Sequence, residues 1–147
     1  MKRINYGRVL VGGILAGVVL FLADGFIHEV LLKDHWMAAM TKAGRSVETE
    51  QHGGDMAYFA LFELLRGIAM AWVYSVFRTH CGPGPSTAVC AALTVWAVMY
   101  PIFLIQEIPL GFYGTTLVAL WSLYELVPSL AAGLLAGALY KDPIIVP

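Results

Sequence analysis

The chain has 147 residues, of which 59% are hydrophobic and 13% are charged, and its formal net charge is −1. An ordinary soluble domain is about 45–50% apolar and about 25% charged. The composition therefore excludes disordered, collagen-like, coiled-coil and disulfide-stapled chains and argues against a soluble single domain. With a mean hydropathy of +0.74, the sequence predicts an integral membrane protein.

Four apolar stretches are long enough to cross a bilayer, which takes about 20 residues of helix. They cover residues 9–32, 56–77, 87–108 and 115–139. We therefore predict an all-α fold, a single membrane domain over residues 1–147 with four transmembrane helices. The polar connection 33–55 becomes the extracytoplasmic loop. Within it, residues 35–40 are typical of a short amphipathic helix on the membrane surface, with Trp36 as an interfacial anchor.

Basic residues near the span ends indicate the orientation, because cytoplasmic segments are enriched in Lys and Arg. The side that holds the termini carries Lys2, Arg3, Arg8, Arg78 and Lys141. The other side carries Lys33, Lys42 and Arg45, diluted by acidic residues. This difference favours both termini in the cytoplasm. The first apolar run is too long for a cleaved signal peptide, so we interpret it as a signal anchor.

Two pairs of segments resemble each other within the chain, and each pair places a glutamate in the same frame. Residues 26–32 resemble 104–110, and residues 62–71 resemble 124–133. The aligned glutamates are Glu29 with Glu107 and Glu63 with Glu125. We therefore predict two tandem helical hairpins, related by a pseudo-two-fold axis along the membrane normal.

Ionisable residues inside the predicted spans are costly, about 3 kcal/mol for a charge at the centre of a helix. All of them fall in the half of the bilayer away from the termini. They are Asp24, His28, Glu29, Glu63, Arg66, Glu107 and Glu125. Because carboxylates outnumber cations, we expect a polar bundle interior in which Arg66 meets two or more carboxylates. A proton, a cation or a water-filled pocket then neutralises the rest.

Helix spacing assigns partners within two of the spans. Asp24 and His28 are four residues apart, and Glu63 and Arg66 are three apart, so each pair shares a helix face. We interpret the second pair as a structural ion pair. Glu125 has no partner in its own helix and lies about 16 Å below the surface, at about 1.5 Å per residue. Such a carboxylate fits proton coupling. A neutral side chain bonded to a neighbouring helix and a salt bridge to Arg66 are the alternatives.

Asp24 and His28 are also the candidates for a metal site, because both residue types ligate metals. With the glutamates they resemble carboxylate-rich bundles that hold two metals, but no Glu-x-x-His motif is present. The metal therefore stays unknown, and the sequence requires no cofactor. No nucleophile–base pair, P-loop or dinucleotide fingerprint assigns a catalytic residue, and no basic patch predicts nucleic-acid binding.

The half of the bundle near the termini contains small residues instead of charges. Glycines four residues apart let helix backbones approach closely. Two such pairs lie at similar depth on the first and fourth spans, namely Gly13 with Gly17 and Gly133 with Gly137. We expect them to pack against each other or against a partner subunit. Pro101 and Pro128 are expected to kink the third and fourth helices.

The first span opens with Ile4-Asn5-Tyr6-Gly7-Arg8-Val9-Leu10-Val11-Gly12-Gly13-Ile14-Leu15-Ala16-Gly17, and an acidic residue follows late in the span. This pattern resembles small bacterial four-helix membrane proteins of unknown function. The resemblance implies four helices in a bacterial cytoplasmic (inner) membrane. It implies neither an activity nor site residues.

Three functions are compatible with these features. The leading expectation is a non-enzymatic membrane protein that acts by association in the lipid bilayer, as a homo-oligomer or as an accessory subunit of a larger membrane complex. The first alternative is a proton- or cation-coupled small-molecule carrier, whose site is lined by Glu125, Glu63, Asp24 and Arg66. The second alternative is a metal-binding membrane enzyme or redox protein.

Overall fold

A computed structural model describes residues 4–44, 53–111 and 113–143, and these residues form helices without any β-strand. Four helices are long and apolar enough to cross a membrane, which confirms the prediction of an all-helical chain with four such segments. They are Tyr6–Leu31, Met56–Cys81, Pro85–Leu110 and Thr115–Leu139. Four helices of this length and composition indicate a membrane protein.

Two of these apolar segments are built from more than one helical element. The elements are α1 (Tyr6–Phe26), the π-helical η1 (Ile27–Leu31), α2 (Lys33–Lys42), α3 (Gly53–Cys81), α4 (Pro85–Ala97), the π-helical η3 (Val98–Ile102), α5 (Phe103–Ile105), α6 (Glu107–Leu110) and α7 (Thr115–Leu139). Pro101 lies within η3, at the place where a distortion of the third span was expected. Pro128 lies within α7, which continues to Leu139.

The helix α3 runs on to Cys81, beyond the predicted end of the second span at Phe77. It stops where the backbone turns left-handed, since Gly82 has φ of 81° and Gly84 has φ of 146°. Only glycine adopts such angles at little cost. Thr87 donates a hydrogen bond from its hydroxyl to the Gly82 carbonyl at 2.9 Å, which secures the turn against the start of α4.

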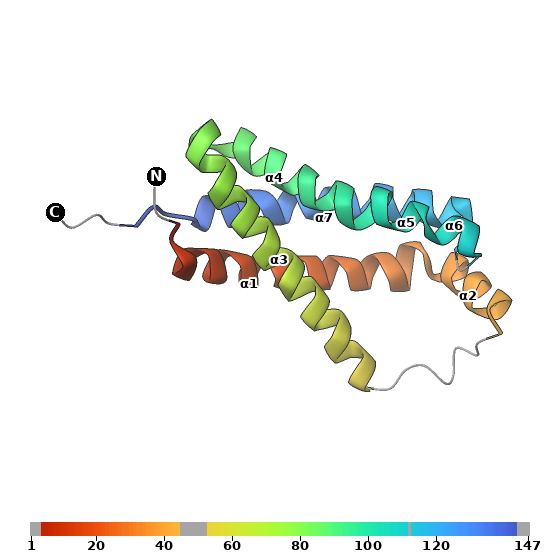
Figure 1. The fold of residues 1–147 in the computed structure, drawn as a ribbon. Helices are drawn as coiled ribbons and strands as arrows, with labels where there is room; N and C mark the ends of the chain where they lie inside the picture. The colour runs from red at the N-terminus through yellow and green to blue at the C-terminus, as the bar shows by residue number, and fades with distance from the viewer. Residues whose placement is uncertain (1–3, 45–52, 112, 144–147) are drawn as a thin grey trace.

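Figure 1 shows α1, α4 and α7 running alongside one another, while α3 crosses them diagonally. Both α3 and α7 pack against α1 and α4. The two ends of the described chain lie together at one end of the bundle, where the Asn5 side chain donates to the Lys141 carbonyl at 3.2 Å. At the opposite end, α3 diverges from the other helices (Figure 1). The helices therefore lie together near the termini, which we call the closed end, while α3 stands apart from the others at the other end, which we call the open end.

The closed part depends on glycines at two separate helix contacts. A Cβ atom added to Gly67 of α3 would lie 2.3 Å from the Gly13 oxygen and 2.3 Å from the Gly17 nitrogen, so the backbones of α1 and α3 touch. Gly133 and Gly137 of α7 face α4, where their added Cβ atoms would lie 2.6 Å and 2.8 Å from alanine side chains. The two glycine pairs thus do not pack against each other, because each has its own neighbouring helix.

The short helix expected over residues 35–40 is present as the longer α2, Lys33–Lys42. It carries no buried residue, which fits a helix at the edge of the bundle. Its Trp36 packs against the protein, with ring centroids 4.9 Å from His28 and 5.1 Å from Trp121. The indole expected to anchor α2 to the bilayer therefore contacts the open end of the bundle.

Candidate functional site

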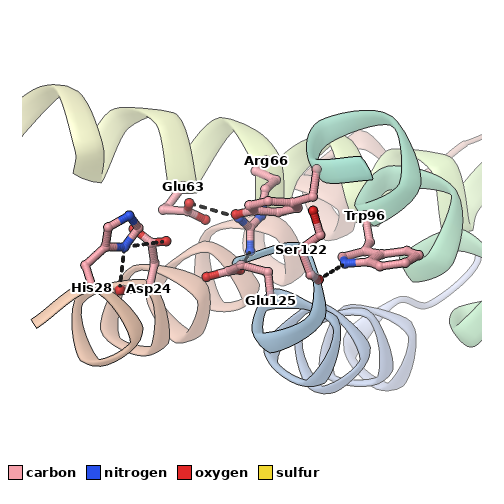
Figure 2. Close-up of polar contacts among 8 residues, drawn as sticks. Asp24, His28, Glu63, Arg66, Trp96, Ser122 and Glu125 are labelled. Atoms are coloured by element: carbon pink, nitrogen blue, oxygen red, sulfur yellow. Dashed lines mark hydrogen bonds and ion pairs between the residues drawn. The ribbon is translucent and has the colours of Figure 1, made fainter. Parts of the chain in front are cut away.

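Arg66 is the centre of a buried ionic cluster that joins two helices. Its Nη1 donates to Glu63 Oε1 at 3.0 Å within α3, and its Nη2 donates to Glu125 Oε2 of α7 at 2.9 Å (Figure 2). Glu63, Arg66 and Glu125 are 1%, 3% and 0% exposed. The expected pairing of Glu63 with Arg66 is present. Glu125 forms the salt bridge to Arg66 that was one of the alternatives for this residue.

A tyrosine from the third span completes the surroundings of the guanidinium. The hydroxyl of Tyr100 accepts a hydrogen bond from Arg66 Nη1, and its ring centroid lies 4.9 Å from Arg66 Cζ, a cation–π contact. Nearby, the Trp96 indole donates to the Ser122 carbonyl at 2.8 Å and ties α4 to α7 (Figure 2). Neither Tyr100 nor Trp96 was among the residues that the sequence predicted for the site.

Asp24 and His28 form a second pair beside this cluster. His28 Nδ1 lies 3.2 Å from Asp24 Oδ1 and 2.9 Å from the Asp24 carbonyl oxygen. Asp24 is also close enough to Glu125 and Arg66 to interact with both electrostatically. The side chains of His28 and Asp24 are 23% and 14% exposed. Together with Glu63, these five residues form one polar group, which we call the carboxylate cluster.

Aromatic rings cover the outer side of the carboxylate cluster. The Trp121 ring centroid lies 5.1 Å from His28, 5.7 Å from Tyr100 and 6.1 Å from Tyr113. Trp36 of α2 adds a ring against His28, Trp121 and Tyr113. All of these contacts except that of His28 with Trp36 are edge-on, and together the rings make an apolar cover. An apolar cover strengthens the interactions among ionic groups beneath it, because the effective dielectric constant falls.

Several polar atoms of the carboxylate cluster have no hydrogen-bond partner among the described residues. They include the second carboxylate oxygens, Glu63 Oε2 and Glu125 Oε1, and the Nε of Arg66. Buried polar atoms are nearly always paired, and an unpaired one is expected to have a specific explanation. Glu63 and Glu125 therefore each use one carboxylate oxygen for Arg66, while the second oxygen of each is buried without a donor among the described residues.

Two of the predicted site residues lie outside the carboxylate cluster. Glu29 is exposed, and Glu107 is half-buried at the start of α6. Neither makes a hydrogen bond or ion pair among the described residues. The described residues also contain no group of three or more His, Cys, Asp or Glu side chains arranged to hold a metal. Asp24 and His28, the metal candidates, thus meet as a pair only.

The carboxylate cluster contains more carboxyl groups than positive partners. Three carboxyl groups face the guanidinium of Arg66 and the imidazole of His28. Even with a protonated imidazole, one carboxyl group has no positive charge to match it.

Comparisons of the chain with models of protein families, with curated proteins and with solved structures find no match.

Proposed function

We propose that this chain is a proton- or cation-coupled carrier of a small molecule and that the carboxylate cluster is its coupling site. One observation carries the proposal: Glu125 is 0% exposed, and its Oε1 has no hydrogen-bond partner among the described residues. A buried carboxyl group with one oxygen held by Arg66 and the carboxyl group of Asp24 beside it is suited to exchange a proton. Intramembrane carboxyl groups that face a bundle interior are typical of proton relays.

Groups from α1, η1, α3 and η3 contribute to the charge balance around Glu125. The titratable and charged groups that face it are Asp24 and His28 of α1 and η1, Glu63 and Arg66 of α3, and Tyr100 of η3. Arg66 matches one carboxylate, and a protonated His28 matches Asp24. The third carboxyl group needs a proton or a cation, since an unmatched buried charge is strongly unfavourable. Binding of that proton or cation therefore changes the forces between α3 and α7.

A gradient of exposure supports access from the open end of the bundle. The exposed fraction falls from 23% at the side chain of His28 to 14% at that of Asp24 and to 0% at Glu125. In our proposal a proton enters at His28, passes to Asp24 and reaches Glu125, next to Arg66. The aromatic cover limits this route to small species.

The proposal includes a topology of two tandem hairpins in a bacterial inner membrane, with both termini cytoplasmic. The first helix of each hairpin contains a π-helical segment, η1 or η3. The second helix of each hairpin contributes a buried glutamate that pairs with Arg66. This glutamate is Glu63 in the first hairpin and Glu125 in the second. These parallels support the repeat. The excess of basic residues on the side of the termini and the resemblance of the first span support the location.

Glu125→Gln is expected to abolish proton uptake with little change in shape, because the amide keeps the volume but cannot release a proton. The protein is reconstituted in liposomes that contain a pH-sensitive dye, and a potassium diffusion potential drives protons inward. The wild type should acidify the lumen faster than protein-free liposomes, and Glu125→Gln should fall to their rate. The pH-dependent part of the carboxyl infrared absorption of the same liposomes should be smaller in Glu125→Gln than in the wild type, by the band of one buried carboxyl group.

Glu107→Gln is the matched control, because Glu107 is a span glutamate outside the carboxylate cluster. This variant should keep both the proton flux and the pH-dependent carboxyl absorption. The carrier proposal is wrong if the wild type acidifies liposomes no faster than lipid alone, or if Glu125→Gln retains the wild-type flux.

Association remains a second candidate function, and the open end of α3 favours it. There α3 diverges from the other helices (Figure 1) and exposes large apolar side chains, among them Tyr58, Phe59 and Leu61. We propose that a second copy of the chain packs on this part of α3. The paired glycines do not support this role, since each pair contacts a helix of its own chain.

Cysteine crosslinking tests the homo-oligomer directly. After Cys81 and Cys90 are replaced by serine, Leu61→Cys should form a disulfide-linked dimer in membranes under mild oxidation. Leu123→Cys, on an exposed position of α7, serves as the control and should stay monomeric. Equal crosslinking of the two variants, or none at either position, would contradict self-association through α3.

A further inference from the structure

A polar pocket and an apolar groove meet at the closed end of the bundle. The polar pocket has a volume of about 450 Å³ and lies between the start of α1 and the residues after α7, with Asn5, Arg8 and Lys141 in its wall. The groove, of about 370 Å³, runs between α1 and α3 and is lined by Leu10 and Trp72 among others. Tyr6 lines both of them, so the pocket and the groove are neighbours, and together they make an amphipathic surface.

The polar pocket carries two positive charges without acidic partners. Arg8 and Lys141 are exposed, and neither makes an ion pair among the described residues. The carboxylate in the pocket, Asp142, is already paired, since its Oδ2 accepts from Arg78 Nη2 at 2.8 Å. The pocket therefore presents a net positive charge at the ends of two membrane-spanning helices.

The groove continues from this charged end toward the middle of the bundle. On α3 its wall extends from Leu65 to Trp72, which at about 1.5 Å per residue is about 10 Å of helix. Its lining is almost wholly apolar: besides the rings of Tyr6 and Trp72 it consists of aliphatic side chains. A molecule that fills both parts thus has an anionic end at the membrane surface and a hydrocarbon chain directed inward.

We propose that this surface is a binding site for an anionic phospholipid. The headgroup phosphate lies between the guanidinium of Arg8 and the ammonium of Lys141, and one acyl chain lies in the groove between α1 and α3. Basic pockets between transmembrane helices bind anionic headgroups, and juxtamembrane basic residues each contribute about 1 kcal/mol to such attraction. The site lies at the opposite end of α1 from the carboxylate cluster and does not rest on the proposed carrier function.

Lipid binding is measured by native mass spectrometry of the full chain released from detergent micelles. Phosphatidylglycerol and phosphatidylcholine with the same dioleoyl chains are the probes. The wild type should retain phosphatidylglycerol several-fold more than phosphatidylcholine. The double variant Arg8→Gln/Lys141→Gln should lose this preference. The matched control Lys33→Gln/Lys42→Gln removes two charges at the other end of the molecule, on α2, and should keep it.

Two further measurements separate a lipid site from a simple anion site. Circular dichroism checks that the variants keep the wild-type helix content, as expected for exposed positions. Glycerol phosphate is added as a competitor that has the headgroup charge without acyl chains, and it should leave lipid binding unchanged. The proposal is overturned if the wild type retains the two lipids equally, if the Arg8 and Lys141 variant keeps its preference, or if glycerol phosphate displaces the lipid.

Discussion

Arg66→Gln should reduce the free energy of unfolding by about 3–5 kcal/mol, the usual cost of removing one partner from a buried ion pair. The variant leaves Glu63 and Glu125 facing each other at a buried site without the guanidinium that lies between them. It also removes the cation from the Tyr100 ring and hydroxyl. The measurement is unfolding by sodium dodecyl sulfate in mixed micelles, followed by circular dichroism.

Arg78→Gln is the control for loss of an arginine as such. Arg78 is half-buried and pairs with the exposed Asp142 at 2.8 Å. Because one partner faces solvent, we expect this pair to contribute less than a fully buried one, about 1 kcal/mol. A triple variant, Glu63→Gln/Arg66→Gln/Glu125→Gln, removes the charges together and should recover part of the stability that Arg66→Gln loses. If Arg66→Gln unfolds at the same detergent fraction as Arg78→Gln, the buried cluster does not hold the helices together.

The sequence predicted those parts of the fold that depend on local chemistry. Hydropathy located the four apolar helices because each must present about 20 apolar residues, and the fourth begins and ends at the predicted residues, Thr115 and Leu139. The pairing of Glu63 with Arg66 followed from helix periodicity alone. These features need no knowledge of which helices are neighbours.

Features that depend on the packing of distant helices could not be predicted in the same way. Tyr100 meets Arg66 only because η3 packs beside α7 and the tyrosine hydroxyl reaches Arg66 of α3. One aromatic residue in an apolar span does not indicate such a partner. Gly67 was not singled out, since no glycine lies four residues away from it. It is nevertheless in backbone contact with both Gly13 and Gly17. The sequence therefore identified the glycines on α1 at this helix crossing but not the glycine of α3 that they contact.

The contact at Gly67 also links the packing of the closed end to the carboxylate cluster, because Gly67 directly follows Arg66. Gly67→Ala places a methyl group where backbone atoms of α1 lie 2.3 Å away. These atoms belong to a helix and cannot rotate aside, so α1 and α3 must separate. Overpacking of this kind costs about 1–3 kcal/mol, occasionally more. We expect Gly67→Ala to lower stability in the same unfolding measurement and to reduce proton flux, since Arg66 is carried away from Glu125.

Gly25→Ala is the matched control on α1, because a Cβ atom there would meet no heavy atom within 4 Å. Alanine is the better helix former by about 1 kcal/mol in soluble hosts, so this variant should be at least as stable as the wild type. Gly67→Ala with unchanged stability would mean that α1 and α3 do not cross at these glycines. Lower stability with unchanged proton flux would mean that the helix crossing and the carboxylate cluster are independent of each other. The crossing would then hold the helices together without positioning Arg66.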